Sequence, residues 1–168
     1  MQIPLTSGAQ LFRLSDFYMR QSVIGLGEAD LRARVGKANS ILWIAGHVTV
    51  GRRRLVNFIG AGGAVIWERE FGKGSAEAMG LTMPSLEDVL AEWDRASAEL
   101  HARLPLLTEV ELEAKMTYEL PESNQTVLGW INYMAFHEAY HIGQISQLRK
   151  ALGQGMARRT AERLAAAR

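Results

Sequence analysis

Apolar residues recur at intervals of three and four positions in four long segments of this chain, which is the spacing of one face of an α-helix. The pattern is clearest in the second segment, at Ile41, Ile44, Val48, Leu55, Phe58 and Ile59. The other three segments cover about residues 12–26, 86–104 and 124–152. Because no stretch shows a confident strand pattern, the sequence predicts an all-α protein built as a four-helix bundle.

Capping residues and glycines indicate where these helices begin and end. Asn39 or Ser40 is placed to cap the second helix, and Ser85 with Asp88 resembles a capping box at the start of the third. Residues 60–84 contain six of the sixteen glycines, which predicts a long irregular connection between the second and third helices. The glycines match neither a dinucleotide-binding spacing nor a P-loop, so we expect no nucleotide site there.

The size and charge of the chain fit one domain without a nucleic-acid partner. A chain of 168 residues can bury a substantial core, and we expect residues 1–155 to form the bundle and residues 156–168 to form a basic C-terminal tail. The net charge is only +1, and no helix-turn-helix pattern or basic recognition helix is present. Binding to nucleic acid is therefore not expected.

The absence of cysteine restricts the chemistry further. Without cysteine the chain has no disulfides, no thiolate metal ligands and no cysteine nucleophile, so any metal would need histidine, carboxylate or carbonyl ligands. The first residues lack the layout of a signal peptide, and the longest apolar run, residues 41–50, is too short to cross a bilayer. We therefore expect a cytoplasmic protein with no membrane partner.

The four histidines carry the strongest functional signal. His137 and His141 are four residues apart in the last long segment, so they share a helix face with apolar neighbours. His47 lies in the apolar stretch ILWIAGHV, whereas His101 lies among charged residues and is expected to face solvent. The three inward-facing imidazoles fit either a metal site or core histidines that bond to the backbone or to Gln144. The residues alone leave both interpretations open.

The order of the helices, the histidine in ILWIAGHV and the motif HEAYHIGQ at residues 137–144 together resemble the DinB/YfiT-like superfamily of small bacterial helical bundles. The resemblance covers about residues 7–153. It implies an up-down-down-up four-helix bundle, a homodimer, and a divalent metal bound by His47, His137 and His141 at the edge of a pocket.

Such a site suits a reaction on a small-molecule substrate. Three protein ligands leave coordination positions open, where a metal could acidify water for hydrolysis or bind a small thiol as its thiolate. Proteins similar to this one include transferases and isomerases that use low-molecular-weight thiols such as bacillithiol or mycothiol. Three imidazoles suit zinc, nickel and iron, and also cobalt and copper, so the sequence does not identify the metal.

Further residues are candidates for supporting roles. Gln144, Tyr133 and Tyr140 lie within one turn of the paired histidines and are candidate cofactor-binding residues. Asp16 is a candidate for orienting a ligand histidine. Glu138 points to a different helix face from His137, so we expect it to form a salt bridge or to face a dimer partner, and we assign no catalytic residue.

The leading hypothesis is a metal-dependent S-transferase or isomerase that uses a low-molecular-weight thiol. A metal-dependent hydrolase is the first alternative. A non-catalytic, stress-related protein that binds a metal or another ligand is the second. A helical interaction module or DNA-associated factor is the weakest, because the sequence carries no recognition motif for nucleic acid.

Overall fold

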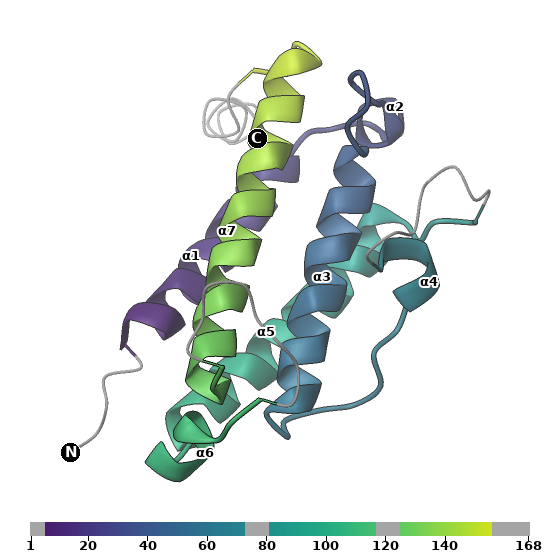
Figure 1. Ribbon diagram of the computed structural model, residues 1–168. Coiled ribbons are helices and arrows are strands. Elements are labelled where there is room, and N and C mark those ends of the chain that lie inside the picture. Colours follow the sequence, from purple (N-terminus) through teal and green to yellow (C-terminus); the bar gives the residue numbers. More distant parts are fainter. Residues whose placement is uncertain (1–5, 73–80, 117–124, 156–168) are drawn as a thin grey trace, which may run out of the picture.

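The computed structural model describes residues 6–72, 81–116 and 125–155, and within these ranges the chain is all-helical, as the sequence predicts. Figure 1 shows the helices in order. They are α1 (Thr6–Val23), α2 (Glu28–Arg32), α3 (Ile41–Phe58), α4 (Glu68–Phe71), α5 (Leu86–Arg103), a 3-10 helix (Leu104–Leu106), α6 (Glu109–Glu113) and α7 (Val127–Ala151). The predicted basic tail, residues 156–168, lies outside the described residues.

The four long helices α1, α3, α5 and α7 correspond to the four periodic segments, but the short helices were not predicted from the sequence. Among the described residues, α2, α4 and α6 have only four or five residues each. A helix of that length cannot show a repeating apolar face, so periodicity does not detect it. In particular, residues 60–84 were expected to be irregular, whereas α4 forms within them.

The long helices begin where side chains can cap them. The Ser40 hydroxyl accepts a hydrogen bond from the Trp43 backbone N–H at 3.2 Å, and Ser85 and Asp88 form a complete capping box. Thr126 caps α7 by accepting from the Gly129 N–H at 3.1 Å. This cap places the start of α7 at Val127, slightly later than the predicted start at 124.

Helix α3 packs against both α5 and α7, and α1 contacts α7 and α5 on the other side of the bundle. Nearly all of the side chains of α3 are buried. One apolar cluster surrounds its first half and includes Trp43 and Ile44, and a second surrounds its last turns and includes Leu55. Burying one large apolar side chain contributes about 1.5–3 kcal/mol, so this packing fixes the position of α3 relative to α7.

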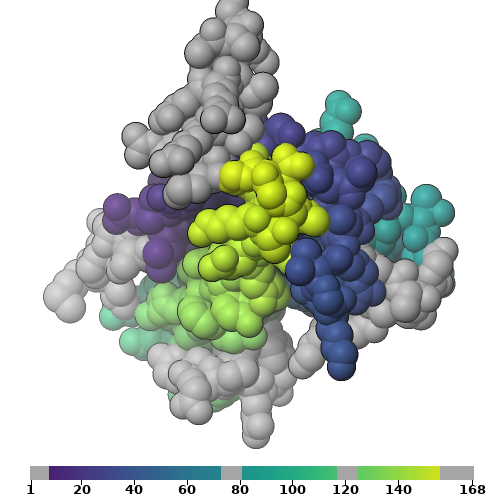
Figure 2. Space-filling view, turned by 90° about the horizontal axis from the view of Figure 1, so that it is seen from above, coloured from purple at the N-terminus to yellow at the C-terminus, as the bar shows by residue number. Residues whose placement is uncertain are grey.

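The end of α7 and the residues just after it contact the last turn of α1 and the connection that leads from α1 to α3. Arg149 donates hydrogen bonds to the carbonyls of Ser22 and Ile24, and Gln154 donates to Asp30 at 2.9 Å. Figure 2 shows this end of α7, in yellow, against the purple and blue residues of that connection. In the described part of the chain, no helix combines the length and the hydropathy that crossing a membrane requires.

Candidate metal centre

Helices α3 and α7 bring three of the four histidines together. His47 comes from α3, and His137 and His141 come from successive turns of α7. The ring centroids lie 5.1 Å apart for His47 and His137, 4.9 Å for His47 and His141, and 4.5 Å for His137 and His141. Gly51 lies beside this cluster, where a Cβ would be 3.1 Å from the end of the flexible Met134 side chain and in ordinary contact, at 3.6 Å, with the His137 ring.

Two of the three rings are oriented by acceptors on their Nδ1 atoms. His47 Nδ1 lies 2.7 Å from the Phe71 carbonyl, and His141 Nδ1 lies 2.8 Å from Gln144 Oε1. A carbonyl oxygen only accepts, so each Nδ1 carries the proton and each Nε2 presents a lone pair. Metal-bound histidines are oriented in this way by an acceptor on the nitrogen that does not bind the metal.

His137 has no arrangement that satisfies both of its nitrogens. Its Nε2 lies 3.2 Å from His47 Nε2, and its buried Nδ1 has no hydrogen-bond partner. If His137 is protonated on Nδ1, two lone pairs face each other and a donor is unpaired; if it is protonated on Nε2, Nδ1 is an unpaired acceptor. An unpaired buried polar group costs about 1–3 kcal/mol. A cation between the Nε2 atoms would relieve the first mismatch.

The distances fit a bound cation. One ligand nitrogen from each histidine can be chosen so that all three lie within 4.8 Å of one another. Tetrahedral coordination with metal–nitrogen bonds of about 2.0–2.1 Å would place the nitrogens about 3.4 Å apart. Small rotations of the rings would close the remaining difference. The three histidines could therefore hold a divalent metal ion.

The protonation of the three imidazoles also suits a metal. Burial, followed by the positive charge that His141, His47 and Arg54 can carry, lowers the pKa of His137 to about 3. Burial likewise lowers the pKa of His47 and of His141, even though their hydrogen bonds to Phe71 and Gln144 act in the opposite direction. All three rings are therefore neutral near pH 7, which is the form that binds a metal.

The histidines open onto a groove of about 1560 Å³ between α3 and α7. Tyr133, Tyr140 and Gln144, the three predicted cofactor-binding residues, all line it. Its charged side chains are Lys37 and Arg54, and no aspartate or glutamate is among the described residues that line it. The groove is therefore largely aromatic, with the three histidines in its wall and with Arg54 paired to Glu68 at its edge.

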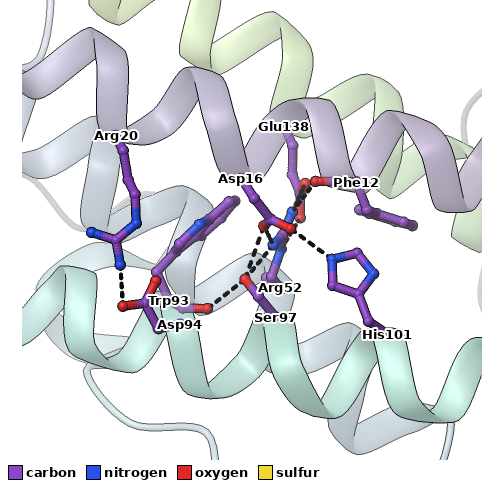
Figure 3. A network of polar contacts seen from close by, with 9 residues as sticks. All are labelled: Phe12, Asp16, Arg20, Arg52, Trp93, Asp94, Ser97, His101 and Glu138. Atoms are coloured by element: carbon purple, nitrogen blue, oxygen red, sulfur yellow. Dashed lines mark hydrogen bonds and ion pairs between the residues drawn. The ribbon is translucent and has the colours of Figure 1, made fainter. Parts of the chain in front are cut away.

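The fourth histidine does not face solvent as the sequence suggested. The His101 side chain is only 18% exposed, and its Nε2 lies 2.6 Å from Asp16 Oδ2. Asp16 was a candidate for orienting a ligand histidine, and this prediction is wrong because the histidine that it contacts lies outside the cluster of three (Figure 3). Residues 99 and 103, which flank His101, are charged, and for that reason the sequence suggested an exposed position. The helix face that carries His101 is instead turned toward α1.

The salt bridge expected of Glu138 is confirmed, and its partner is Arg52, which was not predicted from the sequence. Arg52 Nε donates to Glu138 Oε1 at 2.9 Å, and Nη2 donates to Glu138 Oε2. Nη1 donates to Asp16 and to Ser97, and Nη2 also reaches the Phe12 carbonyl at 3.4 Å. Figure 3 shows these side chains converging from all four long helices. The signal that could have revealed them is a charged residue on each apolar helix face.

The comparison with protein families gives one match. The model of the DinB superfamily matches residues 18–145, which is more than half of the chain and includes all three clustered histidines. No curated protein matches the chain.

Proposed function

The chain belongs to the DinB superfamily, and we propose that it is a divalent-metal-dependent S-transferase or isomerase that uses a low-molecular-weight thiol. His47, His137 and His141 would hold the metal. The convergence of their three imidazoles, two of them oriented through Nδ1, is the observation that carries this proposal. We also propose that the four long helices keep the family's up-down-down-up order.

The bound metal would supply one piece of chemistry: it would keep a thiol as its thiolate at neutral pH. The residues of the chain do the rest. Phe71 and Gln144 keep the proton of His47 and of His141 on Nδ1, so both Nε2 atoms stay available. Tyr133 and Tyr140 present aromatic surface to the substrate and the thiol, and the side chain of Tyr140 is half exposed in the groove.

The lining of the groove favours thiol transfer over hydrolysis. A metal-dependent hydrolase commonly uses a nearby carboxylate as general base, and the described lining residues include none. Glu138 cannot serve, because it is fully buried against Arg52. Thiol transfer would need no such base, because a metal held by the three histidines would keep the thiol as its thiolate. A non-catalytic metal-binding protein of the stress response remains the second candidate, since the same centre can bind a metal without turnover.

Metal analysis of protein purified without a polyhistidine tag or a nickel column tests the proposal. We expect about one divalent metal ion per chain in the wild type and none in His137→Ala. The identity of that ion would also choose between zinc, nickel and iron. A wild type that retains no metal and takes up none in dialysis would overturn the proposal.

Turnover is tested next with bacillithiol, mycothiol and simpler thiols against an aryl chloride, in which a sulfur–carbon bond forms as chloride leaves. We expect release of chloride that requires both the metal and one of the thiols. A metal-loaded protein that is inactive with every thiol would favour the non-catalytic candidate.

We further propose that the protein is a cytoplasmic homodimer. Helix α1 carries an apolar stripe that is 44–57% exposed, formed by Leu11, Leu14, Phe17 and Tyr18. Exposed apolar patches of this kind are common at protein–protein contacts. Light scattering should give twice the mass of the chain, and Leu14→Glu with Phe17→Glu should halve it. A monomeric wild type would exclude the homodimer.

A further inference from the structure

Helix α4 contacts the histidine cluster through a backbone carbonyl. Its last residue, Phe71, provides the carbonyl that accepts from His47 Nδ1 at 2.7 Å. His47 is the only one of the three clustered histidines that comes from α3. The orientation of its ring, which also stacks on Trp43 with centroids 4.9 Å apart, therefore depends on where α4 lies.

The position of α4 is fixed by a close contact with Gly46. The Phe71 side chain is fully buried and packs directly on the backbone of Gly46. A Cβ at Gly46 would lie 2.4–2.5 Å from three atoms of the Phe71 ring, which is closer than any real contact. Because glycine is unfavourable inside a helix, its presence in the middle of α3 has a packing reason, and that reason is the Phe71 ring.

Two other features hold α4 in this place. Arg54 Nε donates to Glu68 Oε1 at 2.8 Å, and Nη2 donates to the second carboxylate oxygen, so α4 is attached to α3 one turn beyond Gly51. Trp67, just before α4, has φ = 60°, a left-handed conformation that is unusual for a bulky residue. Such a conformation persists only where the surrounding structure imposes it.

We propose that α4 is a positioning element for a metal ligand: Gly46 admits the Phe71 ring, and the Phe71 carbonyl then sets the orientation and the protonated nitrogen of His47. This inference rests on the proposed function, because it assumes that His47 binds a metal. It adds that the affinity and geometry of the centre depend on residues that touch neither metal nor substrate.

The test is the variant Gly46→Ala, with cobalt(II) as the probe. Alanine favours helix more than glycine does, so helix propensity alone would leave the protein at least as stable. The added methyl must instead displace Phe71 and its carbonyl from His47. We expect cobalt affinity to fall by about 10–100-fold, the range for loss of an outer-shell partner, and the visible absorption band of the bound cobalt to shift.

Two matched variants separate this effect from a general loss of packing. Gly8→Ala makes the same change in α1, where the new Cβ would have only ordinary contacts of 3.5 Å or more, so affinity and spectrum should not change. Gly46→Ala combined with Phe71→Leu removes the ring that the methyl meets but keeps the backbone carbonyl, and it should restore most of the affinity and the original band.

A third variant covers the case in which Gly46→Ala does not fold. Glu68→Gln breaks an exposed ion pair and leaves the core intact, and it should weaken cobalt binding by a smaller factor with a shift of the band in the same direction. Suppose that wild type binds cobalt and that Gly46→Ala keeps the wild-type affinity and spectrum; the role of α4 is then wrong, while the proposed function stands. Where Gly46→Ala does not fold, the same conclusion follows if Glu68→Gln keeps the wild-type affinity and spectrum. If wild type itself binds no cobalt or other divalent metal, the proposed function fails first.

Discussion

Glu138 is enclosed in a hydrogen-bonded network around Arg52, whereas His137, its neighbour in the sequence, faces a groove with a buried nitrogen that has no partner. Adjacent residues of a helix point about 100° apart, so α7 presents one polar cluster to the interior and another to the groove. The first cluster pairs every donor of its guanidinium, although the buried Trp93 Nε1 beside it has no partner. The second cluster leaves unpaired a nitrogen of one of its three candidate metal ligands. This difference separates a structural network from a candidate binding site.

Every hydrogen-bond donor of the Arg52 guanidinium has an acceptor. All five N–H groups of the guanidinium point to acceptors, and Cζ lies 3.6 Å from the centroid of the Trp93 ring. The carboxylates of Glu138 and Asp16 raise the pKa of Arg52, although burial acts to lower it. Burial also acts to raise the pKa of Asp16, but its hydrogen bond from His101 and the charge of Arg52 lower it overall. Arg52 and Asp16 are therefore charged at neutral pH, whereas burial raises the pKa of Glu138 against the opposing effect of Arg52.

Removal of Arg52 should give the largest effect of all. Arg52→Met would leave two carboxylates beneath the surface without their cation, and breaking a buried ion pair in this way costs about 3–5 kcal/mol. Urea denaturation of the metal-free protein measures the loss. The matched control is Arg20→Met, whose ion pair with Asp94 is about half exposed and should be worth at most about 1 kcal/mol. Equal losses in the two variants would contradict the structural role of the network.

His137→Ala should show the opposite behaviour. Because His137 is incompletely satisfied without a ligand, its removal should change the stability of the metal-free protein by less than about 1 kcal/mol. Metal affinity should fall more than 100-fold, which corresponds to more than about 2.7 kcal/mol of binding free energy. Calorimetric titration measures the affinity, and His101→Ala is the control, because His101 contacts Asp16 and lies outside the cluster. A His101→Ala variant that also loses the metal would refute the assignment of the site.

The sequence predicted the three clustered histidines but not the Arg52 network, for a physical reason. Two histidines four apart in HEAYHIGQ must share a helix face, so their proximity is local and visible in the sequence. The partners Arg52 and Glu138 lie 86 residues apart, and each alone resembles a solvent-facing charge. Their pairing depends on how α3 packs against α7, which periodicity does not specify. The sequence indicates the network in one way: a charged residue stands at a position where the apolar pattern predicts burial.

The same limit explains the missed role of α4. Four residues of helix within a glycine-rich connection give no periodic pattern, and the contact that matters is a backbone carbonyl, which every residue has. Gln144 was predicted beside His141 because the two are three residues apart on one helix. The acceptor for His47 lies 24 residues away and becomes visible only in three dimensions.

Gln144→Leu should have an intermediate effect. It removes the acceptor from His141 Nδ1 and leaves the volume of the side chain nearly unchanged, so metal affinity should fall about 10–100-fold. Gln147→Leu is the matched control, because Gln147 lines the same groove one turn later. Calorimetric titration of both variants makes the measurement. If both variants bind metal as wild type does, the hydrogen bond to Gln144 does not tune the centre.

The smallest expected effect is a pH dependence that belongs to the histidine cluster and not to the Arg52 network. An unfolded histidine takes up a proton near pH 6.5, but burial delays protonation of His137 in the folded protein to about pH 3. Between these values the unfolded state binds more protons, so the metal-free protein loses stability as the pH falls. His137 is partly open to the groove, and we therefore expect a loss of only about 1 kcal/mol between pH 7 and pH 5.

Denaturation curves at the two pH values measure this loss in metal-free wild type and in a variant with His137→Ala and His141→Ala. The double variant should lose less stability on acidification, because two of the three histidines whose pKa burial lowers are gone and only His47 remains. Asp16 does not titrate in this window, since its lowered pKa keeps its carboxylate ionised below pH 5. Burial raises the pKa of Glu138, but this carboxyl is present in both proteins, so any proton that it takes up cancels in the comparison. If wild type and the double variant lose equal stability on acidification, groups other than His137 and His141 cause the acid sensitivity. The difference between the two polar clusters of α7 would then not include a difference in how they titrate.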